Sequence, residues 1–188
     1  MTDPRLKKLA DLLVNYSVSV KPGDWVLLRG NIFAEPLVNE VYKELVKAGG
    51  NVTLQLTTDA ITEAYYKEAS SDQLKWVDPT TKLLYEKMDV LVGIDGSSNT
   101  RSLTGVDPKN QQTRAVATRE LSEHFLERSA KKEARWVGTR YPCHAFAQEA
   151  DMSLSEYEDF VYAACYCDKK DPIAEWKRVH DEQQKVVD

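Results

Sequence analysis

Cysteine and histidine are scarce in this sequence, with three of each among 188 residues. An odd number of cysteines does not indicate a disulfide framework, so we expect free thiols in a reducing compartment. The 25 basic residues are outnumbered by 30 acidic ones, and the net charge of −5 lacks the positive excess of a nucleic-acid-binding protein. No apolar run approaches the roughly 20 residues of a membrane span, and the first residues lack the layout of a signal peptide. These absences predict a cytoplasmic protein that binds neither nucleic acid nor membrane.

Glycine is also infrequent, and the motifs that depend on it are missing. Gly30 stands alone after the first predicted strand, and no Gly-x-Gly-x-x-Gly or Gly-Lys-Ser/Thr pattern occurs, which argues against a nucleotide site. No Gly-x-Ser-x-Gly elbow supports a serine nucleophile. Cys143 and His144 are adjacent, so their side chains are expected to point apart rather than to form a catalytic pair.

The sequence also lacks the spacing of a metal site, with no His-Glu-x-x-His and no Cys-x-x-Cys pattern. If residues 153–167 form one helix, Cys165 and Cys167 lie about 200° apart around it and cannot share an ion. We therefore predict that this chain holds no metal and no catalytic residue.

Strand and helix patterns alternate along the chain, which predicts parallel pairing of the strands. The fold class is therefore α/β: a layered domain with a mainly parallel sheet of about four or five strands flanked by helices. The apolar run 89–94 is expected to be central and the alternating run 52–56 nearer an edge. The predicted strands lie at 25–28, 52–56, 89–94 and around 134–137, and the predicted helices at 3–20, 35–48, 59–69, 72–77, 78–87, 107–130, 142–150, 153–167 and 171–187.

Proline and serine define the predicted helix starts near the C-terminus. Pro142 is expected in the first turn of the helix 142–150. Ser153 and Glu156 have the spacing of a capping box, in which each side chain binds the other's backbone N–H.

Ligands of open parallel sheets bind beyond the carboxyl ends of the strands. In this chain those ends are 29–31, 57–59 and 95–101. The loop after the third strand supplies most of the candidates for lining a substrate site or an interface: Gly96, Ser97, Asn99, Thr100 and Arg101. A solvated turn without a role is the alternative for this loop.

Several separated motifs resemble the N-terminal domain of the aminopeptidase T-like metallo-aminopeptidases. The resemblance covers nearly the whole chain and rests on 9–14, Lys21-Pro22-Gly23-Asp24, Glu35-Pro36-Leu37-Val38, Ala48-Gly49-Gly50, Tyr141-Pro142, 147–150, 152–153, 156–160, Asp171-Pro172 and Trp176. It implies one domain, 1–188, with a core at 1–170 and a helix at 171–188 that leads toward an absent catalytic domain. Tyr141 and His144 join the candidates because they lie near that expected boundary, although a surface position is the alternative for His144.

The resemblance also implies an activity for the intact enzyme. That enzyme would remove N-terminal residues from peptides with a divalent metal pair of zinc, cobalt or manganese, whose ligands lie in the C-terminal domain. This chain alone is expected to be inactive and to supply the cleft wall, interdomain contacts and contacts of a homodimer. The alternative is a stand-alone α/β protein-interaction module. A truncated domain is expected to expose apolar surface around Trp176 and the last helix.

Overall fold

A computed structural model describes residues 3–187 and contains one four-stranded sheet whose strands are all parallel. The strand order is β2-β1-β3-β4, so the apolar third strand is internal and the second strand is at an edge, as predicted. The strands are β1 (Trp25–Asn31), β2 (Asn51–Thr57), β3 (Val90–Asp95) and β4 (Arg135–Arg140). The α/β prediction is confirmed.

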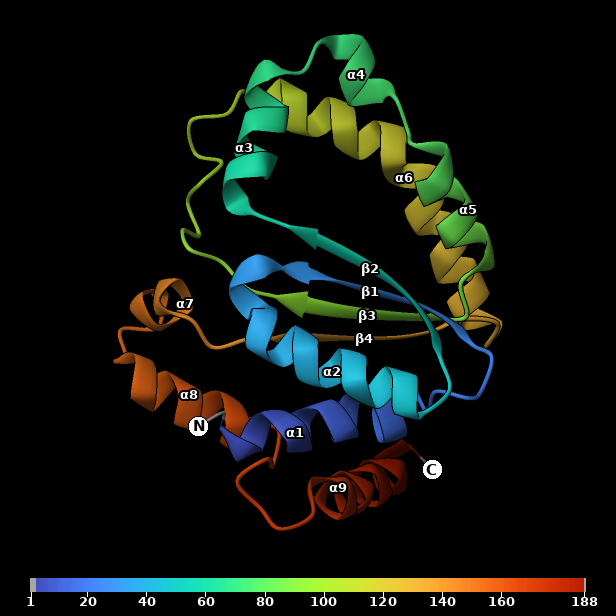
Figure 1. The fold of residues 1–188 in the computed structure, drawn as a ribbon, viewed down its shortest axis with the longest axis vertical. Helices are drawn as coiled ribbons and strands as arrows, with labels where there is room; N and C mark the ends of the chain where they lie inside the picture. Colours follow the sequence, from blue (N-terminus) through green and yellow to red (C-terminus); the bar gives the residue numbers. More distant parts are fainter. Residues whose placement is uncertain (1–2, 188) are drawn as a thin grey trace.

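Helices cover both faces of the sheet. Figure 1 shows α1, α2 and α9 on one side and α3 to α6 on the other, with α7 and α8 beside the carboxyl ends of the strands. The helices are α1 (Pro4–Asp11), η1 (Leu12–Ser17), η2 (Ile32–Ala34), α2 (Glu35–Lys47), α3 (Asp59–Glu68), α4 (Ser71–Lys75), α5 (Pro79–Lys87), α6 (Pro108–Ala130), α7 (His144–Glu149), α8 (Leu154–Ala164) and α9 (Pro172–Val187). None of these helices within residues 3–187 is both long and apolar enough to cross a membrane.

The face beneath α1, η1, α2 and α9 holds the larger core. Val26 and Leu28 of β1 and Val90 and Val92 of β3 point into it and are completely buried. Apolar residues of α1, η1 and α2 complete this core, which runs along the full length of the two central strands, β1 and β3. The apolar faces of these amphipathic helices thus pack on the apolar face of the sheet.

The opposite face has a smaller core near the amino ends of the strands. It consists of Leu27, Leu84, Met88, Leu91, Phe125 and Ala134. The 23-residue helix α6 contributes only Phe125 as a buried residue, and α3 contributes none. The carboxyl-terminal half of this face is therefore left without a packed apolar layer.

Several predicted helix boundaries are wrong, and one is that of the helix expected at 72–77, which is α4 and ends at Lys75. The first helix does not continue unchanged to residue 20, because α1 passes at Leu12 into the π-helix η1. Helix α7 begins at His144 with Cys143 as its cap, so Pro142 precedes the helix instead of lying in its first turn. Helix α8 ends at Ala164, because Tyr166 adopts a left-handed φ of 57° and turns the chain.

This turn carries the Cys167 thiol into the core, where it is completely buried. Cys165 and Cys167 therefore do not lie on one helix. All three cysteines are free, as predicted, and burial raises the pKa of Cys167 to about 12. A thiol with that pKa is a poor nucleophile and a poor metal ligand near neutral pH.

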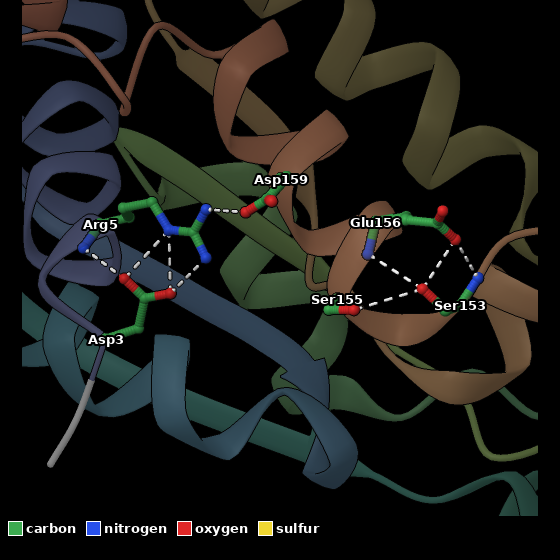
Figure 2. A network of polar contacts seen from close by, with 6 residues as sticks. All are labelled: Asp3, Arg5, Ser153, Ser155, Glu156 and Asp159. Carbon is green, nitrogen blue, oxygen red and sulfur yellow. Dashed lines mark hydrogen bonds and ion pairs between the residues drawn. The ribbon is translucent and has the colours of Figure 1, made fainter.

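Polar contacts fix the ends of α1 and α8 (Figure 2). Arg5 of α1 donates to both carboxylate oxygens of Asp3 and forms a 2.5 Å ion pair with Asp159 of α8. The predicted capping box is present: Glu156 N donates to Ser153 Oγ at 3.3 Å, and Ser153 N donates to Glu156 Oε2 at 2.9 Å.

The last helix packs on the domain through its first turns. Trp176 is half-buried against the larger core, and its Nε1 donates to the carbonyl oxygen of Cys165 at 3.2 Å. The exposed large apolar side chains of α9 are instead Val186 and Val187, at 87% and 78% exposure. Within the described residues, Trp176 is thus packed and not exposed as expected, and the large apolar side chains that this helix exposes lie at its far end.

Candidate functional site

A cleft of about 1660 Å³ opens over the carboxyl ends of the strands, on the sheet face that lacks a packed layer. Its position follows from the topology. The connection that follows β1 leads to β2, on one side of β1 in the sheet. The connection that follows β3 leads to β4, on the opposite side. The two connections therefore leave the neighbouring strands β1 and β3 in opposite directions. Such a switch point leaves a crevice beyond the strand ends, where ligands of open α/β sheets bind.

The floor of the cleft is one row of residues across the sheet. Gln55 of β2 pairs with Arg29 of β1, Arg29 pairs with Gly93 of β3, and Gly93 pairs with Gly138 of β4. A Cβ atom added at Gly138 would meet nothing within 4 Å. The two neighbouring glycines therefore leave a flat patch of bare backbone beside the Arg29 side chain.

The loop after β3 forms one rim of the cleft, and Asp59 at the start of α3 holds it in place. Asp59 Oδ2 accepts hydrogen bonds from Ser98 N at 2.7 Å, Ser97 Oγ at 3.0 Å and Asn99 N at 3.2 Å. Its other oxygen accepts from Asn31 Nδ2 at 2.9 Å. Partial burial opposes ionisation, but the hydrogen bonds from Ser98, Ser97 and Asn99 outweigh it and lower the pKa of Asp59.

Gly96 lets this loop approach the segment that follows β1. A Cβ atom at Gly96 would lie 3.1 Å from the Cβ and 3.2 Å from the backbone N of Ala34. These separations are tighter than ordinary contacts, so a larger residue would push the rim away from the end of β1.

Ion pairs form the other side of the cleft. Arg140 of β4 pairs with Asp95 of β3 at 3.4 Å and lies over the Phe146 ring, 4.5 Å from its centroid. Glu149 of α7 accepts from Thr100 Oγ1 at 2.8 Å and pairs with Arg101 at 3.3 Å. The hydrogen bond from Thr100 and the charge of Arg101 lower the pKa of Glu149.

The structure brings most of the predicted site residues together. Gly96, Ser97, Asn99 and Thr100 line the cleft, and the strand ends 29–31 and 57–59 meet them there. Arg101 is not among the lining residues but binds Glu149, which is.

Tyr141 and His144 do not line the cleft. Tyr141 is half-buried between two apolar clusters, and burial raises its pKa. His144 is exposed at the first position of α7. Whether either residue belongs to an interface stays a prediction.

The sequence did not predict the β4 side of the cleft, which is lined by Gly138, Thr139, Arg140, Phe146 and Glu149. The residue spacing in the sequence could have placed two of these residues on the same face of the sheet. Gly138 and Arg140 are two residues apart in a strand, so their side-chain positions face the same side of the sheet.

The charged groups of the cleft do not converge on a metal position. Between residues 3 and 187, no group of three or more His, Cys, Asp and Glu side chains lies close enough to hold an ion. The carboxylates that line the cleft, Asp59, Asp95 and Glu149, each bind partners within the domain. The residues present therefore do not fit a metal pair.

Comparison with known proteins agrees with the observed architecture. In the solved structure of wild-type AmpT from Thermus thermophilus, a region covering 47% of that chain superposes on 97% of this one with a TM-score of 0.76. The sequences are 17% identical, so this likeness establishes the fold alone.

Two curated relatives are similar to this chain in sequence. Aminopeptidase 2 of Geobacillus stearothermophilus is 24% identical over 197 residues, which cover 99% of this chain and 48% of the relative. Aminopeptidase PepS of Streptococcus thermophilus is also 24% identical, over 94% of this chain and 45% of the relative. The chain thus spans about half the length of the curated relatives it matches. The family of thermophilic metalloproteases (M29) matches residues 2–188, and the chain belongs to this family.

Proposed function

We propose that this chain is the N-terminal domain of a metal-dependent aminopeptidase that removes N-terminal residues from peptides. The family match over residues 2–188 carries the proposal, together with relatives that are named aminopeptidases and are about twice as long. In this proposal the zinc, cobalt or manganese pair is held by residues outside this chain.

The contribution of this domain would be a pre-formed wall of the substrate cleft. The rim loop 96–100 is anchored by Asp59, and the opposite side is fixed by the Arg140–Asp95 pair. Because these contacts are internal, the wall keeps its shape without a partner, which favours binding of a positioned substrate. Our candidates for substrate or interdomain contacts remain Gly96, Ser97, Asn99, Thr100, Arg101, Tyr141 and His144.

We also propose a cytoplasmic location and a homodimer for the intact protein. The support for the location is the composition, with three free cysteines and no disulfide among them. The dimer rests on the family resemblance, and sedimentation of the intact protein tests it.

The direct test of the function is release of N-terminal residues from short peptides, with Zn²⁺, Co²⁺ or Mn²⁺ added and bound metal measured on the same sample. We expect no turnover and no stoichiometric metal for the 188-residue chain. A protein of the relatives' full length that carries this chain as its first half should show turnover that a chelator abolishes.

Aminopeptidase 2 serves as the positive control in this assay. Chelator-sensitive turnover by the chain alone would show that the metal site lies within it and contradict the proposal. An inactive full-length protein would instead favour the stand-alone interaction module.

A further inference from the structure

Almost all of the charged side chains that line the cleft form hydrogen bonds or ion pairs within the domain. Asp59 receives hydrogen bonds from the rim, Asp95 pairs with Arg140, and Glu149 pairs with Arg101. The remaining charged lining residue is Arg29, which forms no ion pair with any residue in the described range 3–187. The cleft therefore presents one positive charge without a carboxylate partner.

The Arg29 guanidinium is held in position although it lacks a charged partner. Its Nη1 donates to the Tyr85 hydroxyl at 2.9 Å, and the Tyr85 ring packs edge-on against Phe125 in the smaller core, with 5.9 Å between ring centroids. One phenol oxygen accepts one of the five N–H groups of an arginine, so most of the donor fork stays available.

The space next to Arg29 is shaped for an extended ligand. Arg29 Nε lies 4.0 Å from the position that a Cβ atom at Gly93 would occupy, and Gly138 beyond it has open space above its backbone. An arginine at the edge of bare backbone can bind a carboxylate through two parallel N–H···O bonds, and the open space above Gly138 leaves room for the atoms attached to that carboxylate.

We propose that Arg29 binds the C-terminal carboxylate of the peptide substrate, whose last residues lie over Gly138. This inference rests on the proposed aminopeptidase function. An enzyme that acts at the N-terminus of a short peptide leaves the opposite end, a free carboxylate, to be bound by the cleft wall. The site would make the enzyme prefer short peptides with a free C-terminus.

The first test measures peptide binding to the 188-residue chain by NMR. The probes are N-acetyl-tetraalanine with a free carboxylate and the same peptide as its C-terminal amide. We expect the acid to shift the Arg29 Nε–Hε signal and to bind about tenfold more tightly than the amide, as one charge-assisted pair allows. Arg29→Gln should reduce acid binding to the level of the amide, and Arg29→Lys, which keeps the charge but loses the fork, should fall between.

Arg178→Gln is the matched control, because Arg178 lies in α9 on the opposite face of the sheet and pairs with Glu175 and Glu182. It should leave the preference for the acid unchanged. Equal binding of acid and amide, or an unchanged preference in Arg29→Gln, would overturn the inference.

A second test separates this inference from the proposed function. In a protein of the relatives' length, Arg29→Gln should lower kcat/KM for tetraalanine about tenfold and leave kcat/KM for its C-terminal amide unchanged. Metal-dependent turnover without this selective loss would reject the Arg29 site while leaving the function in place. If Arg29→Gln impairs both peptides equally, Arg29 does not recognise the carboxylate, and the inference is wrong.

Discussion

The two faces of the sheet differ in how completely they are covered. Beneath α1, η1, α2 and α9, apolar side chains are buried along the whole length of the two central strands, whereas Leu54 and Leu56 of the edge strand β2 are 44% and 41% exposed. On the other face, six buried residues cover the amino-terminal half, and the carboxyl-terminal half carries Arg29, Gln55 and two glycines. Stability therefore resides mainly in one face, and the other is free to present polar groups to a ligand.

The largest expected changes in stability come from truncating two neighbouring leucines of β1, one on each face of the sheet. Leu28 points into the larger core and Leu27 into the smaller one, at 0% and 1% exposure. We expect Leu28→Ala to lower the free energy of unfolding by about 4 kcal/mol and Leu27→Ala by about 2 kcal/mol, because the smaller core can relax toward the cleft. Urea denaturation of both variants measures the difference, and a larger loss for Leu27→Ala would contradict the assignment of stability to the covered face.

Asp59→Asn tests whether the open face is held by polar contacts. Loss of the charge weakens the bonds from Ser97, Ser98 and Asn99, so we expect a cost of about 1–2 kcal/mol and faster amide exchange at residues 96–100. Since the folded-state pKa of Asp59 is lowered, its contribution is present above the unfolded pKa and lost as pH falls through the folded one.

The pH dependence supplies the control for this variant. The stability difference between the wild type and Asp59→Asn should be full at about pH 7 and shrink as the pH falls through the lowered folded-state pKa of Asp59. A difference that stays constant over this range would show that the charge of Asp59 does not hold the loop.

Alanine substitution of two cleft glycines gives smaller effects of opposite sign. Gly96→Ala places a methyl group 3.1 Å from the Cβ of Ala34, and we expect it to cost about 1 kcal/mol. Gly138→Ala meets no atom within 4 Å and should raise stability by about 0.5 kcal/mol, because alanine loses less backbone entropy on folding. Thermal denaturation measures both, and a destabilised Gly138→Ala would mean that the floor is not open.

Gly138→Ala also tests whether the peptide bound by Arg29 lies over Gly138. The added methyl group lies where the end of the peptide would cross the floor, so the variant should be more stable and yet bind N-acetyl-tetraalanine several-fold less tightly, by about 1 kcal/mol. The same NMR titration gives the affinity. Unchanged affinity would show that the peptide does not cross Gly138.

The sequence predicted the covered face better than the open one. The apolar runs of β1 and β3 and the spacing of α2 are strong local signals, and the strand ends that meet at the cleft follow from parallel pairing. The sequence signal is weaker for Asp59, whose bonds to residues 97–99 span about 40 positions. Contacts of that range depend on the register of distant segments, which local periodicity does not determine.

The wrong boundaries have a similar cause. Residues 153–167 have a helical pattern, yet burial of Cys167 and the left-handed Tyr166 end the helix at Ala164. Tertiary packing thus overrides local propensity. Pro142 is compatible with a first helical turn, but the backbone at Cys143 is extended. The helix therefore begins at His144.

The strand order also has a consequence for how this domain is made. β1 and β2 can pair as soon as α2 has formed, but the other edge of β1 waits for β3, which comes only after α3, α4 and α5. Pairings between distant segments slow folding, and an unpaired apolar strand is prone to aggregate in the meantime. During synthesis, the nascent domain therefore keeps the Leu27-Leu28 edge exposed until β3 has left the ribosome. A folding chaperone would be most useful over that interval.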